Sequence, residues 1–315
     1  MTAGAACPIC GADLRLSFAL PGLRIQRCTG CGHRVADHDR PQGADSDYHA
    51  QYEEGAFLES LRATRLRQAR VLVAAIRCHV AQPEAILDLG AGRGFFLEVC
   101  RWEGLAPLAG ADTSERAVAD LRRAGIEAHL LPDEPDPAAP LGALARALSF
   151  SPRVVTLLDV IEHLPPEHVA AFLISLLKEL GAALELLIIK VPVADGLLYG
   201  IARLAAAASV PGPLRQLYQA GTWPPHRSYF TVLSMATLLA GLGLEVIERL
   251  DDLDFEPELL PARLNRAPSA AAPLLKLGGR GLAATAQALG RLDTATFLAW
   301  PRPGSSIASE RGNGH

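Results

Sequence analysis

The sequence predicts an α/β fold: a Rossmann-like sheet preceded by a small N-terminal metal-binding segment and a helical cap. Three observations support this prediction. A strand, a glycine turn and a helix follow one another over residues 86–103, apolar strands alternate with helices after that unit, and two Cys-x-x-Cys pairs precede it. The chain has 315 residues, half of them hydrophobic, so we expect about two domains with a substantial core.

The N-terminal segment contains two cysteine pairs, and a glycine follows each of them. The ligands would be Cys7, Cys10, Cys28 and Cys31. Four soft thiolates in a tetrahedron suit structural Zn²⁺, and residues 14–26 between the pairs predict a hairpin around Pro21-Gly22. We therefore expect a zinc ribbon over residues 1–36, the alternative being a redox dithiol. Cys78 and Cys100 lie in helical surroundings and are expected to be ordinary buried thiols.

Residues 37–82 are predicted to form a linker and a helical cap. The polar stretch 37–51 contains Tyr48, which lies one helical turn before Tyr52. This pair either packs locally or closes over a neighbouring pocket. Residues 57–80 have apolar side chains at helical spacing. The arginines of this helix are expected to form a solvated face; they are residues 62, 65, 67, 70 and 77.

The glycine turn follows a short apolar strand that contains Asp88 and Leu89. Gly90, Ala91, Gly92, Arg93 and Gly94 come next, and then the helix 95–103. Glycine lets a backbone approach a ligand closely, and free N–H groups gather at the start of a helix. The pattern therefore predicts a nucleotide-type pocket. A dinucleotide fingerprint would need glycine at the sixth position, which Phe95 occupies here, so NAD fits poorly.

Acidic residues follow two further predicted strands. Strand 105–111 ends at Asp112, near the spacing at which a carboxylate reaches a ribose hydroxyl in βαβ pockets. Asp112 can instead cap the next helix, as can Thr113 or Ser114. Strand 153–159 leads into Asp159-Val160-Ile-Glu162-His163, which would lie beside the same pocket. These last side chains can act as a base, hold a divalent ion or fix the loop.

The remaining chain continues the alternation of helices and strands with one interruption. A strand is predicted at 184–191, and residues 194–222 form an insertion whose apolar helix, 196–209, ends at Pro211-Gly-Pro213. This insertion is expected to be a substrate lid, extra core cover, or a surface for a membrane or a partner. A helix at 233–242, a strand at 244–250, an alanine-rich helix at 270–289 broken at Gly278-Gly279, and a last strand at 294–300 follow. Residues 301–315 are predicted to be a disordered tail.

The glycine turn, written Asp88-x-Gly90-x-Gly92-x-Gly94, resembles motif I of class I S-adenosylmethionine (SAM)-dependent methyltransferases. With Asp112 and Asp159-Val-Ile-Glu-His-Leu it is similar to a broad bacterial group in which a zinc ribbon and a tyrosine-containing cap precede that core. His226-Arg-Ser-Tyr-Phe-Thr231 matches a further segment of this group. The resemblance covers residues 7–255. It implies a seven-stranded sheet in a SAM-binding domain over 83–300, with 194–222 as its lid.

The resemblance also implies an activity and a site. SAM is the expected cofactor, and the acceptor is an O, N or C atom of a small molecule such as a sugar, a lipid or a secondary metabolite. His163, then His226 or Tyr48, is the expected base. Cofactor contacts are implied for Asp88, Leu89, Gly90, Ala91, Gly92, Gly94, Asp112, Thr113, Asp159 and Val160. Related ubiquinone-type O-methyltransferases hold a divalent ion on Glu-x-x-Glu-His, which suggests Asp159, Glu162 and His163 as ligands here.

Two features of the sequence limit these expectations. The turn before the fifth strand reads Glu179-Leu-Gly-Ala-Ala183, where the family has Pro-Gly-Gly, so its geometry is left open. The net charge of −4 gives no basis for general nucleic-acid binding.

We expect a cytoplasmic protein without a membrane span, because the N-terminus lacks a signal-peptide pattern and residues 196–210 are too short to cross a bilayer. A zinc-ribbon interaction module with a vestigial SAM fold and an NAD-dependent oxidoreductase are the alternatives.

Overall fold

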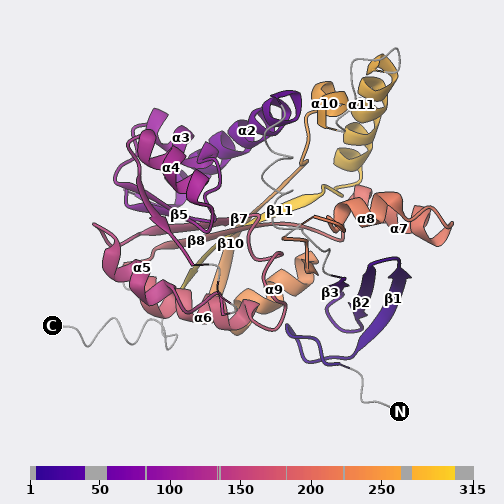
Figure 1. Cartoon of the computed structure of the whole chain (residues 1–315), viewed down its shortest axis with the longest axis horizontal. Coiled ribbons are helices and arrows are strands. Elements are labelled where there is room, and N and C mark those ends of the chain that lie inside the picture. The colour runs from indigo at the N-terminus through magenta and orange to yellow at the C-terminus, as the bar shows by residue number, and fades with distance from the viewer. Residues whose placement is uncertain are drawn as a thin grey trace.

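The computed structural model describes residues 5–39, 55–81, 84–132, 134, 136–181, 183–222, 224–263 and 272–301. Tyr48 and Tyr52, and all but the first residue of the predicted tail, lie outside these described residues. The fold combines a large mixed sheet, helices on both of its faces, and a small N-terminal sheet (Figure 1).

The large sheet has seven strands in the order β10-β11-β8-β7-β4-β5-β6. Strands β4 to β8 pair in parallel, whereas β11 is antiparallel to both β8 and β10. The strands are β4 Ile86–Leu89, β5 Leu108–Asp112, β6 Glu127–Leu130, β7 Val154–Leu158, β8 Leu186–Pro192, β10 Leu244–Asp252 and β11 Thr294–Pro301. The chain runs from β4 outward to β6 and then returns to β7 on the other side of β4. Ligands bind at such a switch point, outside the carboxyl ends of the strands.

Helices cover both faces of this sheet (Figure 1). Helices α2, α3 and α4 lie on one face and α5, α6 and α9 on the other. Their bounds are α2 Gly55–His79, α3 Phe95–Trp102, α4 Glu115–Arg123, α5 Leu141–Ala147, α6 Val169–Leu180 and α9 Val232–Gly241. The central strands β4 and β8 are buried on both faces, which explains why they are apolar apart from one charged residue each, Asp88 and Lys190. This arrangement confirms the predicted α/β fold with a Rossmann-like seven-stranded sheet.

The N-terminal segment forms a four-stranded antiparallel sheet in the order β1-β2-β3-β9. Its first three strands are β1 Leu14–Leu20, β2 Leu23–Cys28 and β3 Arg34–His38, and β1 and β2 form the hairpin around Pro21-Gly22. The fourth strand, β9 Ser228–Tyr229, comes from the distant segment that contains His226. The N-terminal sheet is therefore completed by a strand from the second half of the chain.

The insertion after β8 folds into two helices, α7 Leu197–Ala207 and α8 Gly212–Leu217. Ile201, Leu204 and Val210 are exposed there, at 46%, 64% and 56%. In the described part of the chain no helix has both the length and the apolar character that crossing a bilayer requires.

Two local predictions were wrong. Helix α11, Ala272–Ala288, continues through Gly278 and Gly279, where a break was expected. A Cβ on Gly279 would lie 3.0 Å from the Leu260 side chain, so a small residue there permits close packing with the short segments η2 Pro257–Leu259 and α10 Leu260–Arg263. The thiol of Cys78 is exposed, since it lies on the outer side of α2, whereas Cys100 is buried as expected.

Candidate functional site

The glycine loop after β4 forms an open hollow. Gly90 and Gly92 have positive φ angles of 74° and 51°. A Cβ at Gly90 would lie 2.5 Å from Val160 Cγ2, so a larger residue there would displace Val160. A Cβ at Gly92, in contrast, would have no atom of the described residues within 4 Å. The amides of Gly90 and Ala91 donate to the Ala111 carbonyl at 2.7 and 3.2 Å. Hydrogen bonds to β5 thus fix the loop backbone on one side, and Gly92 faces the cavity on the other.

Two carboxylates flank this loop. Asp88 is buried beneath it and accepts a hydrogen bond of 2.5 Å from Thr156 Oγ1. Burial raises the pKa of Asp88 to about 7, and the charge of Asp112 adds to that shift. Asp112 accepts from the Gly92 amide at 2.7 Å and from the Ser114 amide at 2.8 Å. The N-cap of α4 is Ser114, so Asp112 is not that cap and its carboxylate lies at the rim of the loop.

These residues line a cavity of about 1910 Å³. A site for one drug-sized molecule measures about 300–1,000 Å³, so this cavity has room for a cofactor and a second ligand. Of the residues predicted to contact a cofactor, the lining includes Asp88, Leu89, Gly90, Ala91, Gly92, Asp112, Thr113, Asp159 and Val160. Gly94 is absent from the lining; it is the left-handed N-cap of α3. The cavity continues from the glycine loop to residues of α7, α8 and the end of β10.

A second group of polar side chains, which we call the acceptor-side cluster, lines the same cavity: Glu162, His163 and His226. One ligand atom from each of them lies within 4.8 Å of the others, and the two histidine rings are 4.7 Å apart between centroids. The Arg227 and Ser228 amides donate to the Glu162 carbonyl at 2.8 and 3.0 Å, which joins the two chain segments. The structure thus brings together His163 and His226, both predicted as bases.

The hydrogen bonds of the two histidines distinguish them. His163 Nδ1 lies 3.0 Å from the Pro225 carbonyl and must donate its proton there, so its Nε2 carries the lone pair. His226 Nδ1 donates to the Leu217 carbonyl at 2.8 Å, and its Nε2 accepts from Gln219 at 3.0 Å. Burial lowers the pKa of both histidines, that of His226 further, so both are neutral at pH 7. His163 is therefore the better placed to accept a proton.

The carboxylate of Glu162 is fully buried, and neither of its oxygens has a hydrogen-bond partner among the residues that the structure describes. Burial, with the charge of Asp159 next, raises the pKa of this group well above its usual value. A buried carboxylate without a partner is satisfied either by a proton or by a cation. One carboxylate and two neutral imidazoles are a donor set that suits a divalent metal.

Asp159 is held apart from that donor set, which corrects the predicted ligands. Both of its oxygens accept from Lys190 Nζ at 2.8 Å, and Arg65 Nη2 lies 2.8 Å from Oδ2. Lys190 also lies 3.7 Å from Asp254. Asp159 has a positive φ of 59°, an uncommon conformation for a residue other than glycine and one that is found at functional sites. His226 takes the place in the cluster that the sequence suggested for Asp159.

Two of the five arginines predicted to form a solvated face of α2, Arg65 and Arg67, instead face other parts of the protein. Arg65 forms ion pairs with Asp159 and Asp254, and Arg67 pairs with Asp252 and Glu256. These contacts tie α2 to the end of β10 across the cavity. Arg62, Arg70 and Arg77 are exposed, as predicted. Arg62 forms an ion pair with Glu98, and Arg77 forms one with Glu103.

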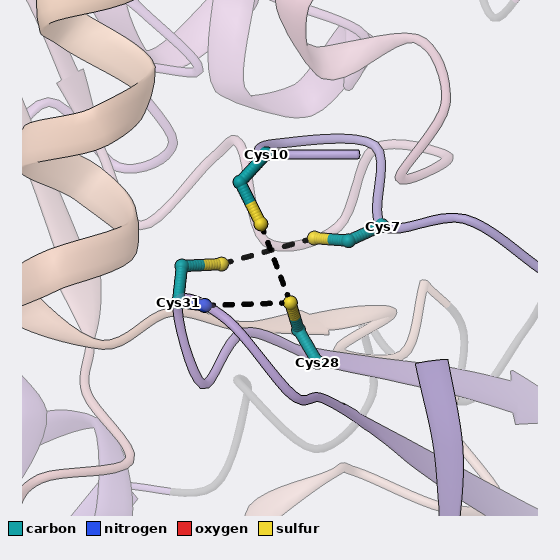
Figure 2. Close-up of side chains that lie close together, drawn as sticks. All are labelled: Cys7, Cys10, Cys28 and Cys31. Carbon is teal, nitrogen blue, oxygen red and sulfur yellow. Dashed lines mark hydrogen bonds between the residues drawn. The ribbon is translucent and has the colours of Figure 1, made fainter. Parts of the chain in front are cut away.

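The four N-terminal cysteines converge on one point (Figure 2). The Sγ atoms of Cys7 and Cys31 are 3.8 Å apart, and those of Cys10 and Cys28 are 3.4 Å apart. A tetrahedral zinc with Zn–S bonds of about 2.3 Å would separate its sulfurs by about 3.8 Å. The Gly30 and Cys31 amides point at Cys28 Sγ from 3.3 and 3.4 Å, an arrangement that stabilises a thiolate. The donor set therefore fits a structural zinc ion.

Sequence reasoning missed Lys190, Arg65 and Gln219. Lys190 was detectable, because it is the single charged residue in the otherwise apolar strand β8. Arg65 was one of several arginines at helical spacing, and nothing nearby in the sequence distinguishes it. Gln219 has a positive φ of 52° at the end of α8 and had no local signal.

The fold agrees with a comparison against models of known protein families. A family model described as a methyltransferase domain matches residues 58–249. The chain therefore belongs to the methyltransferase-domain family. Its sheet is that of the class I SAM-dependent methyltransferases, as the motifs predicted. No curated protein sequence matches the chain.

Three solved structures resemble this chain at low sequence identity. Magnesium protoporphyrin IX methyltransferase from Synechocystis PCC 6803, with bound S-adenosylhomocysteine, is 14% identical with a TM-score of 0.48; the match covers 81% of this chain and 93% of that one. A SAM-dependent methyltransferase from Archaeoglobus fulgidus is 18% identical with a TM-score of 0.43, covering 81% and 100%. The cyclopropane synthase MmaA2 from Mycobacterium tuberculosis is 14% identical with a TM-score of 0.47, covering 72% and 83%.

Proposed function

We propose that the protein transfers the methyl group of SAM to a small molecule, and that the acceptor atom is a hydroxyl oxygen of a sugar, a lipid or a secondary metabolite. One observation carries this proposal: a single cavity joins the open glycine loop to the acceptor-side cluster. The sulfonium methyl is already activated, so the enzyme's main task is to hold the acceptor in line with it. A cavity that accommodates both molecules meets that requirement.

In this proposal the cofactor occupies the end of the cavity beside β4 and β5. Asp112 accepts hydrogen bonds from the ribose hydroxyls, since a carboxylate has about four lone-pair sites and two of them are used by Gly92 and Ser114. The bare backbone at Gly92 lets the cofactor approach the loop. Leu89, Ala91, Thr113 and Val160 would form the walls.

His163 is the proposed base. The acceptor oxygen attacks the methyl carbon, the C–S bond breaks with its electron pair going to sulfur, and S-adenosylhomocysteine leaves. The hydroxyl proton passes to His163 Nε2, which carries a lone pair because Nδ1–H donates to Pro225. A neutral amine already presents a free lone pair, and a carbon without an acidic proton has none to give, so neither would use such a base; this is why a hydroxyl acceptor is favoured.

A screen of acceptor classes with methyl-labelled SAM tests this assignment. With an acceptor found, His163→Gln should lower kcat about 10²- to 10⁴-fold while SAM affinity stays unchanged. His129→Gln is the matched control, because His129 lies on β6 beside Glu127 and outside the cavity lining. Unchanged turnover in His163→Gln would remove this histidine as the base, and label on nitrogen or carbon would overturn the hydroxyl assignment.

A divalent cation at Glu162, His163 and His226 is the second candidate role for this cluster, favoured by the unpartnered Glu162 carboxylate. A cation there would lower the pKa of an acceptor hydroxyl. Metal analysis of the purified chain separates the two roles. The base proposal predicts one tightly bound ion, at the four cysteines. Two ions, reduced to one by Glu162→Gln, would support the cation instead.

Calorimetry tests the cofactor directly. SAM and S-adenosylhomocysteine should bind with micromolar affinity, and NAD should not bind. Tight NAD binding would favour an oxidoreductase, and absence of all three interactions would favour a vestigial domain.

A further inference from the structure

The N-terminal sheet and the acceptor side of the cavity share backbone hydrogen bonds. Strand β3 pairs with β9, with Arg34 opposite Tyr229 and Val35 opposite Ser228. The Ala36 amide also donates to the Arg227 carbonyl at 2.8 Å. His226 immediately precedes these paired residues, so β3 directly supports the segment that carries a cavity-lining histidine.

Two side-chain hydrogen bonds extend this support on either side of β9. His38 Nε2 lies 2.9 Å from the carbonyl oxygen of His226 and donates to it. On the other side, Thr231 Oγ1 donates to the carbonyl of Cys31 at 2.7 Å. Cys31 is one of the four cysteines that fit zinc, so one bond runs directly from the proposed metal site to the segment that follows His226.

The apolar face of the N-terminal sheet packs against helices α7 and α8. Leu23, Ile25 and Ala36 are buried in one cluster with Tyr199 and Ala202 of α7 and with Leu214, Tyr218 and Tyr229. The hydroxyls of Tyr199 and Tyr218 are 2.9 Å apart, and the Arg34 guanidinium lies over the Tyr199 ring at 5.8 Å. Tyr199 and Tyr229 also line the cavity. The tyrosines thus form a layer between the N-terminal sheet and the acceptor side.

The N-terminal segment has a small core of its own. The buried cluster around the cysteines contains Cys7, Leu14, Cys28 and Cys31, with Ile9, Ala12 and Val35 against it. A segment of about 30 residues with so little core usually depends on its metal to fold. The glycine loop, in contrast, is held by β5 and its own helix, without contacts from the N-terminal sheet among the hydrogen bonds of that loop.

We infer that the Cys7, Cys10, Cys28 and Cys31 metal centre positions the acceptor side of the cavity: it holds β3, through which it fixes residues 226–231 and helices α7 and α8, while the SAM-binding loop is independent of it. Loss of the metal should therefore disable acceptor binding and leave SAM binding intact. This inference rests on the proposed function for the meaning of "acceptor side", but its test measures structure and cofactor affinity and requires no acceptor.

Hydrogen–deuterium exchange of the full chain, before and after zinc removal by a chelator under reducing conditions, tests the inference. Amides of residues 226–231 and of α7 and α8 should exchange at least about tenfold faster after removal, together with those of β1–β3. Amides of β4, the glycine loop and β5 should keep their rates, and the SAM dissociation constant should stay within about twofold. Cys28→Ser should reproduce both results.

A second variant separates the contact from the metal. His38→Ala removes the bond to the His226 carbonyl and leaves all four cysteines in place. It should retain its zinc and its SAM affinity, and residues 226–229 should exchange at least about threefold faster. Leu16→Ala is the control, since Leu16 is 55% exposed on β1, the strand at the far edge of this sheet. It should change none of the three measurements.

Three results would overturn the inference. Exchange confined to β1–β3 after zinc removal would make the N-terminal segment an independent module. Simultaneous loss of SAM binding would make the metal a general stabiliser of the whole chain. Unchanged exchange at 226–229 in His38→Ala would refute the contact route. Failure of the proposed function would be recognised by a different measurement: the zinc-loaded protein would not bind SAM.

Discussion

Gly92→Ala is the substitution that separates cofactor contact from backbone stability most cleanly. Gly92 has a φ of 51° and lies in the cavity lining, and in the described part of the chain no atom would lie within 4 Å of an added Cβ. The added methyl group would therefore contact no neighbouring side chain. It would project into the space that the proposed cofactor occupies.

The magnitude follows from two contributions. Placing alanine in the left-handed region costs about 1–2 kcal/mol in the free protein, because Cβ crowds the carbonyl oxygen. Occupying the hollow should further weaken SAM binding by at least about 1.4 kcal/mol, which is a tenfold higher dissociation constant. The first contribution affects folding and the second affects binding, so separate measurements resolve them.

Gly104→Ala supplies the control. Gly104 follows α3 with a φ of 76°, and an added Cβ there would also meet no atom within 4 Å, but Gly104 is absent from the cavity lining. Both variants should lose about 1–2 kcal/mol of unfolding free energy in urea titrations. In calorimetry, Gly92→Ala alone should bind SAM at least about tenfold more weakly. Equal SAM affinity in the two variants would refute the placement of the cofactor over Gly92.

Further predictions concern the charged groups. Asp112→Ala should weaken SAM binding by about 1–3 kcal/mol, measured by calorimetry, because ribose hydroxyls lose a charged acceptor; an unchanged dissociation constant would contradict ribose recognition at this residue. Lys190→Met should lower the free energy of unfolding in urea by about 2–4 kcal/mol, because Lys190 is 6% exposed and its loss leaves Asp159 with Arg65 as its ion-pair partner. Arg249→Met, which breaks a surface ion pair with Asp251, should lower it by less than about 1 kcal/mol. Equal losses in the two variants would show that burial does not determine the strength of these pairs. Burial raises the pKa of Asp293 from 3.8 to about 6, so the folded state binds this proton more tightly than the unfolded state does. The protein is therefore most stable, with respect to this group, below pH 3.8, and it loses stability as the pH rises to about 6. Asp293→Asn should therefore gain stability over the natural chain as pH rises from about 4 to 6 and level off above that at no more than about 3 kcal/mol, and a gain independent of pH would refute the shift.

Sequence reasoning reached the features whose signals are local. The glycine loop, the four cysteines and the acid after the second strand are each recognisable within a few residues, because a tight turn, a metal knuckle and a strand end impose residue types directly. The alternation of apolar strands with helices likewise predicted the sheet, since both faces of its central strands are buried.

The remaining features depend on contacts between distant segments. Asp159 is close in sequence to Glu162 and His163, but its carboxylate forms ion pairs with Lys190 of β8 and Arg65 of α2. The side chain that lies beside Glu162 and His163 is instead that of His226, which is distant in sequence. The pairing of β3 with the two-residue strand β9 joins Arg34 and Tyr229, which lie far apart in the sequence, and has no periodicity to detect. The continuous helix through Gly278-Gly279 reflects packing against Leu260, which local propensity does not report.

The most direct test of the account is a crystal structure of the full chain with S-adenosylhomocysteine. It should show the ribose hydroxyls on Asp112, the thioether beside Gly90–Gly92, and the sulfur facing the side of the cavity that contains Glu162, His163 and His226. A ligand bound elsewhere, or a ribose without contact to Asp112, would contradict the proposed site.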